Sequence, residues 1–452
     1  MDRLTRIAFL SEHASPVALL GGVDAGGQNV YVDEVSRHLA RHGYAVDVFT
    51  RRASAEEPEI VDWAAGVRVI NLTAGPASPL PKDELWPYMP EFRDTFLQFM
   101  QRDEARYDLI HGNFWMSGWV ATELRARLGI PAVQIFHAMG KTKRRYQKQV
   151  DTSPRDRIRV ELGIVRDVDR MIAQCPCEQA ELVQDYGADP RRVAIVPSAV
   201  NTTIFQPVPS GEARKQIGLD PRAKVIVYVG RLVPRKGIAN IVQALALLVR
   251  QYKEAAPPVS PSSLALMIVG GETVEPDATS TPEIGALRRL AEELGVAEYV
   301  RFTGKREPNM LRYYYSAADV VVSTPWYEPF GLTALEAQAC GRPMIGSAVG
   351  GLTFTIQDGK TGFLVPPKDP AALAARLDHL LSSPELCRQM GRAARKRVER
   401  EFTWDIVAMR TGALYETVLA DREREAGLLE TLIGALPLVP ENNAGGIDRG
   451  AS

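Results

Sequence analysis

The chain has 452 residues, too many for a single hydrophobic core and enough for two domains of ordinary size. Its 54 basic and 55 acidic residues give a net charge of −1, so no overall positive field recruits nucleic acid or an anionic membrane. With four cysteines, no signal-peptide core and no apolar run of membrane-spanning length, the composition predicts a cytoplasmic protein with reduced thiols.

Strands and helices alternate along the first half of the chain. Short apolar runs predict strands over residues 7–10, 45–50, 67–72, 107–111, 131–137, 171–175 and 193–196. Helices are expected over 92–105 and 117–128, and a further helix has Val30, Val35 and Leu39 on one side and ends at His42-Gly43. This alternation is typical of a mostly parallel sheet covered by helices on both faces.

The loop after the first strand contains four glycines, Gly21, Gly22, Gly26 and Gly27. They do not form the Gly-x-Gly-x-x-Gly fingerprint, which argues against a nicotinamide cofactor. Glycines here let a phosphate or a sugar ring approach the backbone closely. Gly26-Gly27, Phe114 and His137 all follow predicted strands, so we expect them to share one cleft.

The alternation restarts after residue 207 and predicts a second sheet. Strands are expected over residues 224–230, 264–269, 300–302, 320–322 and 344–345, with helices at 238–249, 384–399 and 404–419. Residues 256–261 are expected to form a flexible loop. The predicted units are an N-terminal domain (1–208), a C-terminal domain (209–402), helices that pack back (403–435) and a flexible tail (436–452).

Two carboxylates eight residues apart, Glu328 and Glu336, lie around the loop that follows the strand at 320–322. A helix opens near Gly331, so both glutamates are expected to face one crevice. Free N–H groups at the start of that helix stabilise an anion. A diphosphate held there, with sugar hydroxyls donating to the carboxylates, fits this arrangement; taken alone, the spacing is equally typical of solvated glutamates.

A pair of cations, Arg231 and Lys236, lies where the strand at 224–230 leads into a helix. Positive charges beside a helix N-terminus are unfavourable unless they face an anion. A nucleotide diphosphate is an anion of that kind. Cys175-Pro176-Cys177 has the ligands of half a zinc site, but no second pair stands at ligand spacing, so no metal site and no cofactor are predicted.

These motifs together resemble the retaining family 4 glycosyltransferases, which have the α/β GT-B fold of two Rossmann-like domains facing across a cleft. The resemblance rests on Gly26-Gly27, Gly230-Arg231 with Lys236, the Glu328-Pro329-Phe330-Gly331 segment with Glu336, and Gly350-Gly351. It implies a nucleotide-sugar donor bound mainly by the C-terminal domain, an acceptor bound by the N-terminal domain, and a C-terminal helix that returns to the N-terminal domain. It also implies metal-independent transfer.

The resemblance further implies roles for individual residues. Glu328 would bind hexose hydroxyls, Glu336 the ribose hydroxyls, and His137 the donor sugar near the reacting carbon. Arg231 and Lys236 would neutralise the leaving diphosphate. The expected catalytic residues are His137, Arg231, Lys236 and Glu328, and the remaining donor-binding residues are Gly26, Gly27, Arg306, Phe330, Gly331, Leu332, Thr333 and Glu336.

The acceptor side is similar to a subgroup that contains sucrose-phosphate synthases and inositol-phosphate N-acetylglucosaminyltransferases. Gln28 is similar to the former, whereas the latter usually carry Met there; Phe114 departs from the Tyr common in the inositol-phosphate type. A basic run begins with Lys141 and Lys143, and it suits an acceptor phosphate as well as a solvated face. The expected acceptor-binding residues are Gln28, Lys82, Phe114, Lys141, Lys143 and Arg157.

The sequence therefore predicts a hexosyltransferase that uses a nucleotide sugar, UDP-glucose in the first instance, and a phosphorylated sugar or polyol, first of all fructose 6-phosphate. Inositol-phosphate N-acetylglucosaminyl transfer is the nearest alternative. A peripheral-membrane enzyme with a lipid acceptor would need an apolar stripe beside the basic run, which is missing. A non-catalytic nucleotide-sugar sensor on the same fold would have lost some of His137, Arg231, Lys236 and Glu328, and all four are present.

Overall fold

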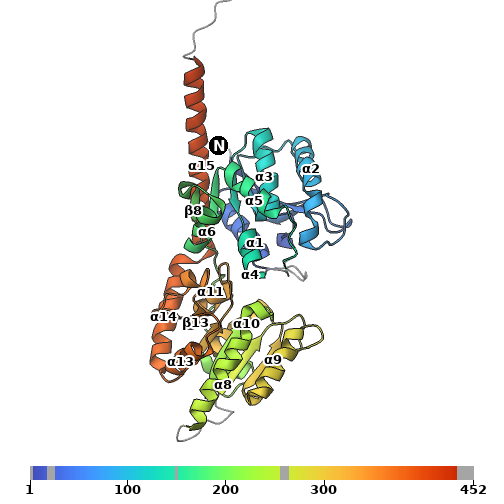
Figure 1. The fold of residues 1–452 in the computed structure, drawn as a ribbon. Coiled ribbons are helices and arrows are strands. Elements are labelled where there is room, and N and C mark those ends of the chain that lie inside the picture. The colour runs from blue at the N-terminus through green and yellow to red at the C-terminus, as the bar shows by residue number, and fades with distance from the viewer. Residues whose placement is uncertain (1–3, 18–25, 148–150, 255–263, 435–452) are drawn as a thin grey trace, which may run out of the picture.

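The computed structural model describes residues 4–17, 26–147, 151–254 and 264–434, and it has two α/β halves with a long final helix (Figure 1). The loop predicted at 256–261, the tail predicted at 436–452 and the first two glycines of the glycine-rich loop lie outside these residues. In the part of the chain that the structure describes, no helix is both long and apolar enough to cross a membrane.

The N-terminal half is built on a sheet of strand order β3-β4-β2-β1-β5-β6-β7-β8, parallel except for β3. Its strands are β1 (Arg6–Leu10), β2 (Ala45–Arg51), β3 (Ile60–Ala64), β4 (Val67–Leu72), β5 (Leu109–Asn113), β6 (Ala132–Ile135), β7 (Arg170–Ala173) and β8 (Val193–Ile195). Seven were predicted, because strands buried on both faces are nearly continuous apolar runs. The antiparallel edge strand β3 was missed, since it is partly exposed and lacks such a run.

Helices cover this sheet on both faces. They are α1 (Gly27–Arg41), α2 (Met89–Arg102), α3 (Phe114–Leu128), α4 (Gly140–Gln147), α5 (Arg157–Asp167) and α6 (Pro176–Tyr186), with a short 3-10 turn η2 (Lys82–Glu84). Val35 and Leu39 of α1 are buried as predicted, but Val30 is exposed. Tyr31 and Val32, in the next turn, take the inward positions instead, so the apolar face was assigned wrongly at that point.

The C-terminal half is a parallel sheet of order β11-β10-β9-β12-β13-β14. Its strands are β9 (Lys224–Val229), β10 (Leu264–Val269), β11 (Val300–Gly304), β12 (Val320–Ser323), β13 (Met344–Ser347) and β14 (Gly362–Val365). Its helices are α7 (Ser210–Gln216), η6 (Pro234–Lys236), α8 (Ile238–Glu254), α9 (Pro282–Glu293), α10 (Pro308–Ala317), α11 (Leu332–Ala339), α12 (Leu352–Thr355), α13 (Pro370–Leu381) and α14 (Pro384–Glu401). The second predicted sheet is therefore confirmed.

The last helix, α15 (Trp404–Gly434), leaves the C-terminal half and packs on the N-terminal half, beside α1 (Figure 1). The Trp404 and Tyr31 rings meet edge to face at 6.0 Å. The Tyr415 hydroxyl lies 2.5 Å from Nδ1 of the buried His111. The helix thus returns to the N-terminal domain as expected.

Candidate active site

The two halves meet at the loop between β12 and α11, which contains residues 324–331. Cys175 at the start of α6 places its Sγ 3.6 Å from the carbonyl oxygen of Pro329 in this loop. A Cβ atom added to Gly27 at the start of α1 would lie 3.0 Å from Leu332 Cδ1, so a side chain at Gly27 would crowd the opposite domain. Gly27 and the loop that carries Glu328 therefore face each other across the cleft.

The backbone around Glu328 is held by a second glycine-containing loop. Gly350 has a φ of 47°, and a Cβ there would lie only 2.1 Å from the Glu328 carbonyl oxygen. The N–H of Gly351 donates to that same oxygen at 2.9 Å. Phe330 is buried, and Gly331 at a φ of 93° precedes the first residue of α11. The Gly350-Gly351 pair thus allows the close backbone packing that fixes this loop.

Three cations and one carboxylate lie together at the carboxyl ends of β9 and β12. Lys236 Nζ is 2.5 Å from Glu328 Oε2, and Arg231 is exposed shortly after the end of β9. Burial, and then the neighbouring charge of Arg231, lower the pKa of Arg235. Arg235 was not among the predicted site residues, although it stands in the same short segment of sequence. Because the cations outnumber Glu328, the cluster is positively charged.

Glu336 lies on α11, the helix that follows the loop of Glu328, and contacts Tyr315 on α10. The Tyr315 hydroxyl donates to its Oε2 at 2.6 Å, and burial raises the pKa of Glu336 to about 7. Leu332 and Thr333 form the first turn of α11, where N–H groups lack partners within the helix. Arg306, after β11, donates to the Val274 carbonyl at 2.7 Å and also to the Tyr314 hydroxyl at 3.1 Å, so its guanidinium is held by protein groups.

On the N-terminal side, Phe114 and His137 follow β5 and β6 with φ values of 74° and 58°. Such values are uncommon for residues other than glycine and are concentrated at functional sites. His137 Nε2 lies 3.1 Å from Asn113 Oδ1, and burial, reinforced by His13, lowers the pKa of His137 to about 3. Its imidazole is therefore neutral at physiological pH. Gln28 donates to Ser11 Oγ at 3.3 Å beside them.

Arg157 is enclosed rather than open to the cleft. Its side chain is 1% exposed, and its Nε donates to Glu161 Oε1 at 2.8 Å. The guanidinium also donates to the Ala138 carbonyl at 2.6 Å and lies over the Phe114 ring. The structure therefore encloses Arg157 against Phe114 and Ala138, where it is not exposed to a ligand.

The lysines expected on the acceptor side also have protein partners. Lys143 Nζ lies 3.1 Å from Asp151 Oδ1, 2.8 Å from Ser153 Oγ and 3.7 Å from Asp83 Oδ2. Lys141 Nζ donates to the Asp185 carbonyl and lies 4.8 Å from the Tyr186 ring centroid. Lys82 is exposed on η2, next to Asp83 in sequence. The structure thus brings the η2 turn and α4 together around Lys143.

Within residues 4–17, 26–147, 151–254 and 264–434, no group of three or more side chains is suited to hold a metal ion.

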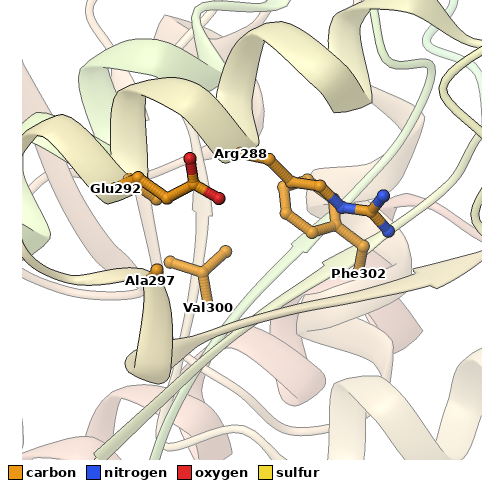
Figure 2. A pocket seen from close by; sticks show the side chains of 6 residues that line it. Arg288, Glu292, Ala297, Val300 and Phe302 are labelled. Atoms are coloured by element: carbon orange, nitrogen blue, oxygen red, sulfur yellow. The ribbon is translucent and has the colours of Figure 1, made fainter.

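A surface pocket lies apart from the charged cluster. It has a volume of about 240 Å³ and lies between α9 and β11, lined by Arg288, Glu292 and Phe302 among others (Figure 2). It contains none of the predicted site residues.

Comparison with known proteins identifies the family. Residues 26–199 match the model of the glycosyl transferase 4-like domain, and residues 210–397 match that of the glycosyl transferases group 1. The chain belongs to the GT-B family 4 glycosyltransferases. It is thus a transferase of a class that uses a nucleotide-sugar donor and a sugar acceptor, and both the family and the GT-B fold predicted from the sequence are confirmed.

Similar proteins include both subtypes that the sequence resembles. The glycosyltransferase is 38% identical over 423 residues to the D-inositol 3-phosphate glycosyltransferase of Acidothermus cellulolyticus, covering 93% of this chain and 92% of the relative. It is also 38% identical to the protein of that name from Kineococcus radiotolerans, covering 93% and 97%.

Among solved structures, the sucrose-phosphate synthase of Thermosynechococcus elongatus is 34% identical, with a TM-score of 0.79 over 92% of this glycosyltransferase and all of that chain. Anabaena HepE, solved in complex with UDP, has a TM-score of 0.70 at 19% identity, which shows the fold alone.

Proposed function

We propose that this glycosyltransferase moves a hexosyl group, glucose from UDP-glucose in the first instance, onto a small phosphorylated sugar or polyol. The observation that carries the proposal is the positive cluster of Arg231, Arg235 and Lys236 beside Glu328 and the start of α11. Such a cluster suits a diphosphate, because an anion there meets both side-chain charge and helix N–H groups.

The proposed chemistry follows from this charge distribution. When the bond between the anomeric carbon and the phosphate oxygen breaks, positive charge develops on the sugar and negative charge on the diphosphate. Fixed cations aimed at the departing phosphate lower that barrier. Glu328, held by Lys236, accepts hydrogen bonds from the hexose, and Glu336 accepts them from the ribose. The acceptor hydroxyl attacks the same face, its proton passes to the leaving phosphate, and the transfer is retaining without a metal.

Two acceptors are proposed. Gln28, at the start of α1 and hydrogen-bonded to Ser11, favours fructose 6-phosphate through its likeness to sucrose-phosphate synthases. The names of the curated relatives favour inositol phosphate, which would come with N-acetylglucosaminyl transfer. Both carry a phosphate, and Lys82 and Lys143 are the proposed cations for it, with Arg157 behind them.

Binding of an acceptor phosphate requires an exchange of partners, because Lys143 already has Asp151 and Ser153. An unphosphorylated polyol would need no such exchange, and this contact is the one observation that favours it as a second candidate. A non-catalytic sensor is disfavoured, since His137, Arg231, Lys236 and Glu328 are all present in the chain.

The test is nucleotide release from UDP-, GDP- and ADP-sugars, each combined with fructose 6-phosphate, fructose, inositol phosphate and inositol, with product mass as the readout. Turnover with one phosphorylated acceptor, and little with its unphosphorylated counterpart, is the expected result. Equal rates with inositol and inositol phosphate, or with fructose and fructose 6-phosphate, would refute the phosphate preference. If no pair of donor and acceptor gives nucleotide release, the proposed substrates are refuted.

A further inference from the structure

Two tyrosines from opposite sides of the cleft stack on each other. Tyr146, on α4 of the N-terminal domain, lies with its ring centroid 4.8 Å from that of Tyr327, and the ring planes differ by 16°. Tyr327 belongs to the loop of the C-terminal domain between β12 and α11. Aromatic rings at this separation attract each other beyond the effect of their buried area. Tyr146 remains 46% exposed, so the stack has a solvent-facing side.

The C-terminal partner stands directly before the proposed donor-sugar ligand. Glu328 follows Tyr327, and its carboxylate is fixed by Lys236. Trp326 precedes Tyr327, and its backbone N–H donates to the Arg235 carbonyl at 2.9 Å. Its ring centroid lies 4.3 Å from Lys368 Nζ. Both neighbours of Tyr327 are thus held by the C-terminal domain, whereas the Tyr327 ring contacts the N-terminal domain.

The N-terminal partner lies on the helix that carries the proposed acceptor lysines. α4 begins at Gly140, three residues after His137, and contains Lys141 and Lys143. Residues three apart on a helix are neighbours on one face, so Lys143 and Tyr146 share a side of α4. Lys143 also reaches Asp151 and Asp83, so a ligand that changes these contacts acts on the helix that holds Tyr146.

We propose that Tyr146 is a positioning residue: its stack on Tyr327 holds the backbone that presents Glu328 and links occupancy of the acceptor side at α4 to the donor loop. The inference rests on the proposed role of Glu328 in donor-sugar binding. Tyr146 itself touches neither substrate. Its effect passes through Tyr327 to the orientation of the neighbouring carboxylate.

The kinetic test compares Tyr146→Ala, Tyr146→Phe, Tyr327→Ala and the double alanine variant. Tyr146→Ala is expected to lower kcat for transfer about threefold to tenfold, the range of an aromatic pair. UDP affinity is expected to stay within about twofold, because the cations of the diphosphate cluster are untouched. Tyr146→Phe keeps the ring and is expected to have the kcat of the unaltered protein. The double variant is expected to lose no more than the single variants, since both remove one contact.

The matched control is Leu128→Ala, which also truncates an exposed apolar side chain, at the end of α3. It is expected to leave the rate unchanged. An unchanged kcat in Tyr146→Ala, a loss in Tyr146→Phe as large as in Tyr146→Ala, or losses that multiply in the double variant would overturn the proposal.

A second measurement needs no substrate and so separates this inference from the proposed function. Hydrogen exchange is measured on peptides spanning residues 325–332 in the free protein. Tyr146→Ala is expected to accelerate exchange there, and Leu128→Ala is not. Equal exchange in all three proteins would overturn the stack's positioning role. If the unaltered protein turns over none of the nucleotide sugars, the proposed function fails, and this exchange comparison still decides the role of Tyr146.

Discussion

The two sides of the cleft hold their cations in different ways. On the C-terminal side, Lys236 is ion-paired with Glu328, whereas Arg231 and Arg235 form no ion pair with the residues that the structure describes. On the N-terminal side, Arg157 is paired with Glu161, and Lys143 with Asp151. An anion can therefore meet Arg231 and Arg235 without displacing a carboxylate, whereas at Lys143 it must replace one. Under the proposed function, the donor diphosphate would meet charge that is already available, whereas an acceptor phosphate would bind by exchange with a carboxylate.

The largest expected effect tests the claim that Arg157 has a structural role. Arg157→Ala leaves Glu161 as a buried carboxylate without its ion-pair partner, which costs about 3–5 kcal/mol of unfolding free energy. Urea unfolding measures this loss. Arg159→Ala, on the same helix with an 80% exposed side chain, is the control and is expected to cost less than about 1 kcal/mol. Equal unfolding free energies for the two variants would contradict the structural role of Arg157 and would favour a direct role in binding phosphate.

Removing one cation from the C-terminal cluster is expected to act on catalysis instead. Arg231→Ala should lower kcat about 100-fold to 1,000-fold, the typical effect of losing one preorganised charge-stabilising group. Steady-state kinetics with the best donor and acceptor pair measure it. Arg288→Ala removes the same charge at the pocket between α9 and β11 (Figure 2) and should leave kcat unchanged. Comparable rates for both variants would remove the leaving-group role of Arg231.

Glu328→Gln separates sugar recognition from diphosphate binding. We expect kcat to fall about 10-fold to 100-fold, because hydrogen bonds to a charged acceptor are lost. UDP should bind at least as tightly as before, since Lys236 is released from its ion pair. Titration calorimetry with UDP gives the second quantity, and Glu292→Gln on the exposed side of α9 is the control. Loss of UDP affinity in parallel with kcat would contradict the assignment.

The smallest expected effect is a pH dependence from Glu336. Its pKa of about 7 means that UDP-glucose affinity should rise about tenfold between pH 6 and 8, as the carboxylate proposed to accept the ribose hydroxyls ionises. Folding stability changes in the opposite sense: because the folded pKa is raised above 4.5, the contribution is complete below that value and is lost as pH rises through 7. Calorimetry and thermal unfolding across this range measure both, and Glu336→Gln should flatten the two profiles.

Much of the fold was predictable because each parallel strand is a short apolar run that ends in a loop. The runs at β9 and β12 also placed Arg231 and Glu328 at the carboxyl edge of one sheet, which is what the structure shows. The edge strand β3 gave no such signal, since its residues are partly exposed and pair on one side only.

Pairing between side chains far apart in sequence was not predictable. The run that contains Lys141 and Lys143 looks like free positive charge in the sequence, and only the folded chain shows Asp83, Asp151 and the Asp185 carbonyl beside it. The burial of Arg235 was not predictable from the sequence either. Its pattern is that of a surface arginine, and its burial beside Arg231 depends on how η6 packs against the end of β12.

The return of α15 to the N-terminal domain has a consequence for how the protein is made. Trp404, Val407 and Tyr415 are buried in the same apolar cluster as Ile7 and Phe9 of the first strand. During synthesis the first domain emerges before this helix, so part of one face of its sheet waits for residues translated after the whole C-terminal domain. Until α15 has been made, the apolar residues of the first domain that it covers stay exposed. Ribosome stalling before residue 404 would expose that face to chaperones and proteases.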